Sequence, residues 1–459
     1  MDDGRADVDI LVIGAGACGL VAAIAAHDAG ANVAVIEKLD HPGGNSALST
    51  GSVPASGTRF QRDAGIADSP ERFIDDLLRT GGPTDCPHLV RRLVETSAAT
   101  VEWLTDCAGA RLELVTAYKH VGHSVPRLHA PASRRGRDLV DDLLAAVEQR
   151  GIPLAVGNGA TALIANASGG VIGADIDANG EQQRIIARKI VVAVNGFAGN
   201  RDLVARFCPE IGGAQYFGAR GSTGEAVLWG ETLGAALGNI GAYQGYAAVC
   251  DTHGSLLSWT TIEKGGIIVN GAGRRFGDES AGYSGYTPDV MAQKGPCFAI
   301  FDQQIFEVAA FEEEFVELAH YGGIKKADTP AALAKIHDLD PSAVAATVEA
   351  YNKAARGDAP DAFGRRDFAL APLAGALSIC RVVPGLFHTQ GGLMVDGDGR
   401  VLRPNGAPIA NLFAGGGAAA GLSGRIGAGG YASGNGLLSA IGLGRLAGIA
   451  AAREIANGE

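Results

Sequence analysis

The stretch VDILVIGAGACG, residues 8–19, decides the fold. Its mostly apolar first half predicts a buried strand of a parallel sheet over 8–13. A glycine-rich turn follows, and the small apolar residues after it predict a helix over 20–29. A second strand is expected over 32–36, ending at Glu37. This order of strand, turn, helix and strand predicts an α/β fold built on a parallel sheet.

The glycines of this turn have the spacing G-x-G-x-x-G, in which each glycine has its own role. Gly14 allows the tight turn, Gly16 lets a diphosphate approach the backbone, and Gly19 lets helix and strand pack closely. The N-terminus of the helix would stabilise the negative charge of the diphosphate. Glu37 can accept hydrogen bonds from ribose hydroxyls. The context on both sides of the turn therefore predicts a dinucleotide-binding site rather than a merely structural turn.

Composition excludes several other classes of protein. Of the 459 residues, 47% are hydrophobic and 19% are charged, which predicts a packed core rather than disorder. Glycine accounts for 68 residues, about twice its usual share. The net charge of −12, without a run of five basic residues, argues against a nucleic-acid partner.

Cysteine spacing and the N-terminal segment bear on the cellular compartment. The seven cysteines are widely spaced, with no C-x-x-C pair, so we expect reduced thiols and no metal site. The acidic start MDDGRADVD is unlike a signal peptide. Glycines and small polar residues interrupt the uncharged runs near 10–26 and 426–444, so we expect no membrane span. A cytoplasmic protein is expected.

The distribution of residue types along the chain predicts two domains. Aromatic and charged residues become commoner between about 245 and 385, and glycine-rich segments then recur in the rest of the chain. We therefore expect one domain over 1–245 that resumes over 386–459, with a second domain inserted over 246–385. Among the individual elements, the sequence predicts a long helix over 87–108, a short strand over 274–276 and a final helix over 435–456.

Several blocks carry a family resemblance. They are GAGACG at 14–19, GGNSALSTG at 43–51, SVPRLHAP at 124–131, VAVNGF at 192–197, GSTGEA at 221–226, GIIVNGAGRRFGDES at 266–280, HTQGGLMVD at 388–396, LFAGGG at 412–417 and GNGLLSAIGLGRLAG at 434–448. In this order they resemble the flavoprotein subunits of fumarate reductase and succinate dehydrogenase, whose relatives include the 3-ketosteroid dehydrogenases. The resemblance covers almost the whole chain. It implies a Rossmann-like FAD-binding domain, an inserted α+β capping domain that bears the substrate, and catalysis between the two.

The resemblance also assigns residues to FAD. The diphosphate would lie on the three turn glycines, the adenosine ribose on Glu37, and the adenine on the backbone of Ala160. The complete set carried over is Gly14, Gly16, Gly19, Glu37, Lys38, Gly44, Asn45, Ser46, Gly51, Ala160, Asn195, Gly196, Gly416, Asn435, Leu437 and Leu438. Some relatives attach FAD covalently to a histidine, whose matching position here is Asn45. Non-covalent FAD is therefore expected. Gly416 is a departure, because the family often has glutamate there.

The substrate positions depart most from the family pattern. Dicarboxylate reductases hold their substrate with two histidines and two arginines. The matching places here contain Tyr246, the arginine-free stretch 281–286, Phe387 and Tyr431. Burying a dicarboxylate without paired cations costs several kcal/mol per charge. We therefore do not expect fumarate or succinate as substrates.

Two tyrosines resemble the catalytic pair of the ketosteroid dehydrogenases. Tyr283 and Tyr431 stand at matching places, and the spacing of Tyr431 and Ser433 is similar to that of the Δ4-type enzymes. One phenol would hydrogen-bond the substrate carbonyl, and the other would take the α-proton while hydride leaves the β-carbon for flavin N5. Tyr246 and Ser433 are further catalytic candidates, Tyr286 is a weaker one, and His388 is expected to be structural.

Three functions remain open at this point. The first is an FAD-dependent oxidoreductase that introduces or reduces a C=C bond α,β to the carbonyl of a cyclic ketone, steroidal or small and alicyclic. The second is an enoate reductase for a carboxylated substrate other than fumarate, anchored by Arg425 or Arg220. The third is a flavoprotein electron-transfer subunit. The first two imply a small-molecule partner and an external electron donor or acceptor.

Overall fold

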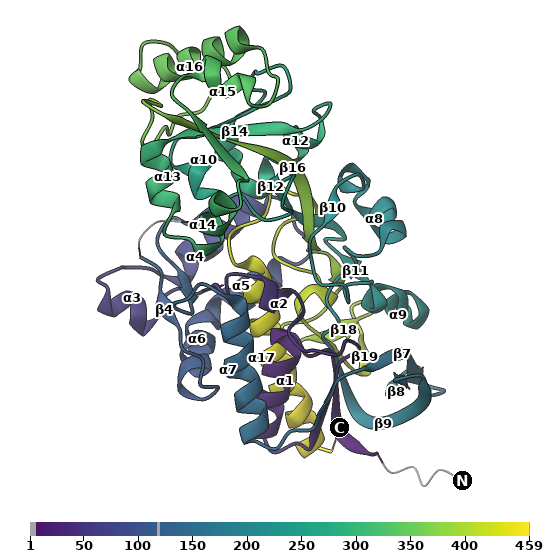
Figure 1. Cartoon of the computed structure of the whole chain (residues 1–459). Helices are drawn as coiled ribbons and strands as arrows, with labels where there is room; N and C mark the ends of the chain where they lie inside the picture. Colours follow the sequence, from purple (N-terminus) through teal and green to yellow (C-terminus); the bar gives the residue numbers. More distant parts are fainter. Residues whose placement is uncertain (1–5, 117–119, 459) are drawn as a thin grey trace. The chain divides into compact units, whose positions relative to one another are not determined.

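The computed structural model describes residues 6–116 and 120–458, so the first five residues of the acidic N-terminal segment lie outside it. The chain divides into two compact units. The first contains the residues up to 209 together with 218–243 and those from 388 onward, and the second contains 210–217 and 244–387 (Figure 1). Strands β12 (Gly241–Cys250) and β16 (Leu377–Thr389) carry the chain from one unit to the other.

The first unit is built on the strand, helix and strand that the sequence predicts. They are β1 (Val8–Ile13), α1 (Ala17–Asp28) and β2 (Val33–Ile36). The helix begins three residues before its predicted start, because the glycine turn closes by residue 16 and leaves Ala17 in helical conformation. Strand β1 pairs in parallel with β2 on one side and with β9 (Glu181–Val192) on the other.

The main sheet of this unit has the order β18-β19-β9-β1-β2-β6. Strands β19 (Pro408–Ala414) and β6 (Leu154–Ala155) extend the parallel pairing, whereas β18 (Arg400–Leu402) is antiparallel. Alternate residues of β1 enter two different cores: Ile10 and Val12 pack in one, and Leu11 and Ile13 in the other. A parallel sheet buried on both faces is the expected arrangement, and the predicted α/β class is confirmed.

The first unit has further elements, of which β7 and β8 belong to the same sheet, because β8 pairs antiparallel with β9 and β7 with β8. They are α2 (Gly44–Leu48), β3 (Val53–Pro54), α3 (Arg59–Asp63), α4 (Pro70–Gly81), α5 (Pro87–Glu95), α6 (Ser97–Asp106), β4 (Glu113–Leu114), β5 (Leu128–Ala130), α7 (Gly136–Gln149), β7 (Asn158–Ala165), β8 (Val171–Ala178), α8 (Arg201–Phe207), α9 (Glu225–Leu233), β11 (Leu237–Gly238), β17 (Gly392–Leu393), β20 (Ile426–Gly427) and α17 (Asn435–Ala456).

Helix α17 packs closely against α1, and Figure 1 shows the two side by side in yellow and purple. Small residues make this approach possible. A Cβ at Gly444 would lie 2.4 Å from the Cys18 carbonyl oxygen, and one at Gly448 would lie 2.3 Å from that of Ala22. The packing fixes the axis of α17 and therefore the position of its N-terminus.

In the described part of the chain, α17 is the one helix long and apolar enough to cross a membrane by length and composition. A core helix meets the same criteria. Of its most apolar stretch, 78% is buried inside the fold, as expected for a helix that packs against α1.

The second unit is a mixed α and β structure around the sheet β13-β14-β16-β12, with β10 and β15 also paired to β16. Its apolar core includes Ile268, Phe298 and Ile379. The elements that belong wholly to this unit are β10 (Gln215–Tyr216), α10 (Thr260–Glu263), β13 (Ile267–Val269), α11 (Gly282–Gly285), α12 (Thr287–Met291), β14 (Cys297–Asp302), α13 (Gln303–Ala309), α14 (Glu313–His320), β15 (Ile324–Ala327), α15 (Pro330–Lys335) and α16 (Pro341–Arg356).

Two predicted elements were wrong. The helix expected over 87–108 is two helices, α5 and α6, which meet at Thr96, where the side-chain hydroxyl bonds the Arg92 carbonyl. Residues 274–276 form no strand. Arg275 instead makes buried ion pairs with Glu279 and Asp361, and these contacts hold the segment as a loop.

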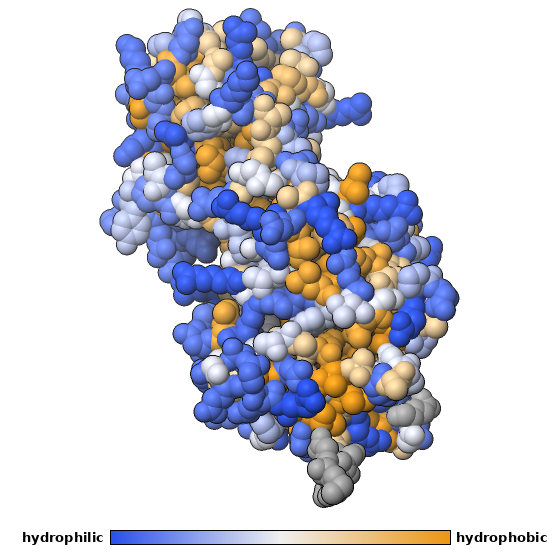
Figure 2. Space-filling model, turned by 90° about the vertical axis from the view of Figure 1, so that its right-hand side faces the viewer, coloured by the Kyte–Doolittle hydropathy of each residue, from blue (hydrophilic) through white to orange (hydrophobic). Residues whose placement is uncertain are grey.

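The surface carries both polar and apolar side chains. Figure 2 shows hydrophilic residues over much of one face with apolar residues between them. Among the described residues, Phe311 is 92% exposed and Ile426 is 78% exposed. Single exposed apolar residues are common in folded proteins and indicate no partner by themselves.

Candidate functional site

A pocket in the first unit opens where β1 and β2 end, as expected for a ligand site of a parallel α/β sheet. It brings together seven of the residues predicted to bind the cofactor. The lining includes Gly14, Gly16, Glu37, Lys38, Gly44, Ala160 and Asn195, joined by Asn158, Ala219, Gly221, Ser222, Glu225 and Trp229.

The three turn glycines differ in what requires them. A Cβ at Gly14, whose φ is 106°, would lie 2.5 Å from the Ala193 carbonyl oxygen. A Cβ at Gly19 would lie 1.8 Å from the Gly14 carbonyl oxygen. At Gly16, by contrast, the nearest atom of the chain would be 3.7 Å away. The fold itself therefore requires Gly14 and Gly19, whereas Gly16 leaves space that a bound diphosphate would fill.

Glu37 is suited to bind a ribose. One carboxylate oxygen accepts the Ala15 N–H at 2.9 Å, and the other accepts the Leu39 N–H at 3.0 Å. These bonds orient the carboxylate at the pocket wall. A carboxylate can accept about four hydrogen bonds in total, so capacity remains for ribose hydroxyls.

A second carboxylate in the pocket was missed by the sequence analysis. Glu225, at the start of α9, forms an ion pair with Lys38, which also donates to Thr223 at 2.7 Å. The other oxygen of Glu225 is buried and has no hydrogen-bond partner within the described structure. An unsatisfied buried acceptor is costly, so this atom fits a ligand that brings its own donors. The GSTGEA block contained this residue, but nothing in its spacing distinguished the glutamate.

The segment 43–51, which contains α2, is held in place by hydrogen bonds from distant backbone N–H groups to its side chains. The Ser46 hydroxyl accepts the Ala17 N–H at 3.2 Å, and the Asn45 carboxamide oxygen accepts the Ala219 N–H at 2.6 Å. Gly51 adopts a φ of 69° against Pro131. These bonds hold the segment beside the N-terminus of α1.

The N-terminus of α17 is the second predicted cofactor contact. Gly434 caps the helix in a left-handed conformation, with a φ of 83° and no side-chain cap. Asn435 is fully buried, and its side-chain oxygen has no partner among the described residues. This oxygen could accept a hydrogen bond from a flavin ring N–H. Leu437 and Leu438 are buried in the core, and the Leu438 N–H already bonds the Gly434 carbonyl.

Tyr431 lies beside this helix start. Its side chain is buried, and burial raises the pKa of Tyr431 to about 12, although hydrogen bonds from the backbone of Gly436 and Gly434 partly offset this rise. A Cβ added at Gly436 would lie 3.9 Å from the Tyr431 hydroxyl. At neutral pH Tyr431 is therefore a neutral phenol held at the positive end of a helix.

A chain of polar side chains links Tyr431 to Asn435. The His388 ring packs edge-on against Tyr431 at 5.7 Å between centroids, and its Nδ1 lies 2.9 Å from the Gln390 amide nitrogen. Ser423 contacts both Gln390, at 3.0 Å, and Asn435, at 3.3 Å. Burial lowers the pKa of His388 to about 4, so the imidazole is neutral. Gln390 and Ser423 were not predicted from the sequence, although both lie in glycine-rich segments.

The second unit contains a cluster of aromatic side chains. Tyr246 stacks between Tyr283 and Phe387, with centroids 5.3 Å away on each side, and Trp259 meets both tyrosines edge-on. The Tyr246 hydroxyl donates to the Leu257 carbonyl at 2.8 Å, which favours a packing role for this residue. Tyr286 is fully buried and stacks on Phe276.

Several other candidates lie apart from these groups. Arg425 bonds Asp85 and keeps 57% of its side chain exposed, and Arg220 is exposed. Ser433 is buried, with its carbonyl bonded to His123 at 2.8 Å.

Gly196 and Gly416 do not line the pocket: a Cβ at Gly196 would lie 2.1 Å from the Thr389 hydroxyl, and one at Gly416 would lie 3.3 Å from Cys18.

No group of three or more His, Cys, Asp or Glu side chains within residues 6–116 and 120–458 could hold a metal ion. Seven of the sixteen predicted cofactor residues thus line one pocket of the first unit, and Asn435 lies at the start of α17 in the same unit. The structure brings Tyr246 and Tyr283 together in the second unit.

Comparison with known proteins identifies the cofactor. The model of the FAD binding domain family matches residues 9–436. The NADH:fumarate oxidoreductase of Klebsiella pneumoniae is 32% identical over 454 residues, which is 97% of this chain but only 48% of that protein. The chain thus spans about half the length of that relative.

Two solved structures share the fold over most of their length. An open-conformation flavocytochrome c3 fumarate reductase superposes with a TM-score of 0.83 at 30% identity, covering 97% of this chain and 78% of that one. The 3-ketosteroid Δ4-(5α)-dehydrogenase of Rhodococcus jostii, solved with 4-androstene-3,17-dione, has a TM-score of 0.78 at 27% identity and 98% coverage of both chains. The suspected family, with its similarity to steroid dehydrogenases, is confirmed. The chain belongs to the FAD binding domain family of flavoproteins, as an oxidoreductase of the class that acts on CH–CH groups.

Proposed function

We propose that this flavoprotein introduces or reduces a C=C bond α,β to a ketone carbonyl, with a cyclic ketone as substrate and FAD bound non-covalently. One observation carries the proposal: a buried phenol, that of Tyr431, lies at the N-terminus of α17, where dicarboxylate reductases would have an arginine. A neutral hydrogen-bond donor suits a ketone oxygen, whereas a buried carboxylate needs a paired cation.

The residues of the first unit would hold the cofactor as follows. The space at Gly16 would take the diphosphate, Glu37 the ribose, and the start of α17 the pyrimidine edge of the flavin. FAD, when bound, supplies the hydride acceptor or donor for the substrate β-carbon. The partial positive charge at the N-terminus of α17 stabilises negative charge placed beside it.

Tyr431 and Tyr283 would act on the substrate carbonyl and α-carbon. Tyr431 holds its proton at neutral pH, because burial raises its pKa to about 12. It can therefore donate a hydrogen bond to a carbonyl oxygen, or a proton in the direction of reduction. Tyr283 is the second phenol, and the stacked rings of Tyr246 and Phe387 give it an apolar neighbourhood that suits a flat cyclic substrate.

The experiment that tests this proposal is anaerobic bleaching of the oxidised flavin. The purified holoprotein would be mixed with saturated steroid ketones, cyclohexanone-type ketones and succinate. Bleaching by a ketone, and not by succinate, is the expected result. Bleaching by succinate alone would overturn the proposal.

The enoate reductase is the second candidate, and the relatedness to fumarate reductases favours it. The arginines available to it are poor anchors, because Arg425 is exposed and paired with Asp85. Reoxidation of the reduced flavin by a monocarboxylated enoate, but not by an enone, would favour this candidate. A flavin that exchanges electrons only with a partner protein would favour the electron-transfer subunit.

A further inference from the structure

We propose that His123 is a positioning residue: it clamps the turn formed by residues 431–435 and thereby fixes Tyr431 and the start of α17. The inference deepens the proposed function and rests on it only for the catalytic role of Tyr431. The clamp itself follows from contacts within the first unit.

Reciprocal hydrogen bonds join two segments that are far apart in sequence. The His123 ring donates from Nε2 to the Ser433 carbonyl at 2.8 Å. The Ser433 N–H donates to the Val121 carbonyl at 3.0 Å. Between these bonds the backbones almost touch, because a Cβ at Gly122 would lie 2.4 Å from the Cβ of Ala432. Residues 121–123 therefore lie directly against residues 432 and 433.

The His123 imidazole is suited to donate this hydrogen bond to the Ser433 carbonyl at all times. A carbonyl can only accept, so the proton of the neutral imidazole lies on Nε2. Burial lowers the pKa of His123 to about 4, which keeps the ring neutral at physiological pH. The charged groups that face it are Arg127, Asp76 and Asp68. Nδ1 has no hydrogen-bond partner within the described residues, so the bond from Nε2 to the Ser433 carbonyl is the one hydrogen bond of this ring there.

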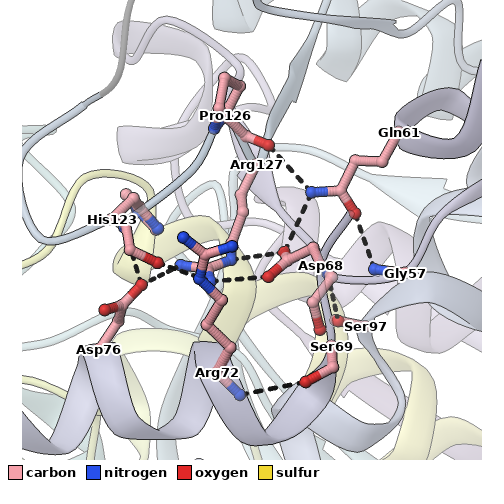
Figure 3. A network of polar contacts seen from close by, with 12 residues as sticks. Gly57, Gln61, Asp68, Ser69, Arg72, Asp76, Ser97, His123, Pro126 and Arg127 are labelled. Atoms are coloured by element: carbon pink, nitrogen blue, oxygen red, sulfur yellow. Dashed lines mark hydrogen bonds and ion pairs between the residues drawn. The ribbon is translucent and has the colours of Figure 1, made fainter. Parts of the chain in front are cut away.

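A buried ion cluster holds the segment that carries His123. Arg127 is fully buried and donates to Asp68 at 2.7 and 2.8 Å and to Asp76 at 2.6 Å (Figure 3). The same Asp76 oxygen accepts the Ser124 N–H at 2.7 Å. Charge-assisted bonds of this kind are among the strongest in proteins. The residue after His123 is thus tied to the cluster through its backbone.

An aromatic ring completes the support. Phe73 lies under the Arg127 guanidinium at 4.6 Å and beside the His123 ring at 5.5 Å between centroids. The imidazole therefore cannot turn away from Ser433 without disturbing packed neighbours. Because Ser433 lies two residues after Tyr431 and two before Asn435, the clamp sets the position of both.

The test compares His123→Phe, which keeps the ring but removes the donor, with His123→Gln, which keeps a donor at similar reach. His129→Phe is the matched control, because His129 is also buried in the first unit and bonds Thr58 at 2.9 Å and Val53 at 3.3 Å rather than the 431–435 turn. The readouts on the FAD-loaded proteins are the flavin reduction potential, the flavin circular dichroism spectrum and ketone turnover.

We expect His123→Phe to retain FAD, shift the flavin potential and spectrum, and lower kcat by roughly 10- to 100-fold, as a displacement near 1 Å can. His123→Gln should restore most of the native flavin potential, spectrum and kcat, and His129→Phe should change none of them. Unchanged flavin properties in His123→Phe, or equal changes in His129→Phe, would overturn the clamp.

If His123→Phe does not fold, Gly122→Ala serves instead, because its added Cβ would push against Ala432 and displace the same turn. Unchanged flavin properties in that variant would also overturn the inference. If no ketone is turned over by the native protein, the proposed function fails, but the flavin potential and spectrum still decide whether the clamp exists.

Discussion

At Tyr431 two effects act in opposite directions on one hydroxyl. Burial raises its pKa to about 12, while backbone hydrogen bonds at the start of α17 favour the phenolate. The net result is a neutral phenol at pH 7. In the proposed reaction this neutral phenol can donate a proton during reduction, whereas service as the base in dehydrogenation requires its rare phenolate.

Replacement of Tyr431 by phenylalanine removes this oxygen and keeps the packing. We expect Tyr431→Phe to fold and bind FAD but to lose about 10²- to 10⁴-fold in turnover. If Tyr431 is the base, the dehydrogenation rate of the native enzyme should rise with pH below a pKa of about 12, because the phenolate fraction grows. Steady-state kinetics from pH 6 to 10 check both points. Native rates in the variant across this range would remove Tyr431 from the mechanism.

The turn glycines allow a matched pair of substitutions. A Cβ at Gly16 meets no atom of the chain closer than 3.7 Å, whereas one at Gly19 would lie 1.8 Å from the Gly14 carbonyl oxygen. Gly16→Ala should therefore keep the stability of the FAD-free protein but weaken FAD binding about tenfold or more, equivalent to about 1.4 kcal/mol. Gly19→Ala should destabilise the fold itself.

Thermal unfolding without FAD and fluorescence titration with FAD distinguish the two glycine variants. Equal FAD affinity in Gly16→Ala and the native protein would show that the space at Gly16 does not hold the diphosphate.

On the scale of elements, α17 connects the core to the site. Its middle packs on α1 through Gly444 and Gly448, and its N-terminus carries Asn435. We expect Gly444→Ala to destabilise the protein by about 1–3 kcal/mol, because the new Cβ would overlap the Cys18 carbonyl oxygen. Gly271→Ala is the control, since a Cβ there meets nothing within 4 Å. Urea unfolding measures both, and equal stability of the two variants would contradict the packing account.

The elements that could be predicted from sequence are those with local signals. The bounds of β1 and α17 follow from an apolar run and from a helix that begins after a glycine, and the structure has both as predicted. The break between α5 and α6 at Thr96 and the loop at Arg275 depend on side-chain contacts with distant residues, which the local pattern does not contain.

The same contrast holds at the site. Gly16 and Glu37 belong to a spaced motif, so their place at the pocket could be predicted. Glu225, Gln390 and His123 bond Lys38, Ser423 and Ser433, which are close to them only in the folded chain, and no spacing in the sequence marks them. The catalytic roles of Tyr431 and Tyr283 stay predictions.

On the scale of the whole molecule, buried histidines make stability depend on pH. Burial lowers the pKa values of His123, His129 and His388 to about 4, against about 6.5 for an exposed histidine. Between these values the unfolded chain binds more protons than the folded one, so stability falls as the pH drops. The loss is up to about 1.4 kcal/mol per pH unit for each histidine.

Urea unfolding at pH 7.5, 6.5, 5.5 and 4.5 tests this dependence. The unfolding midpoint should be steady down to about pH 6.5 and then fall steeply. A midpoint that stays constant to pH 4.5 would mean that these imidazoles titrate freely in the folded protein.

The proposed enzyme acts on a C=C bond conjugated to a ketone and not on a dicarboxylate. The most direct measurement is a competition, in which the anaerobically reduced holoprotein receives equal concentrations of a cyclic enone and of fumarate. Analysis of the products after flavin reoxidation gives the preference in one experiment. We expect the saturated ketone with negligible succinate, because the proposed site binds its substrate with neutral phenols, whereas a buried dicarboxylate needs paired cations. Succinate as the main product would contradict it.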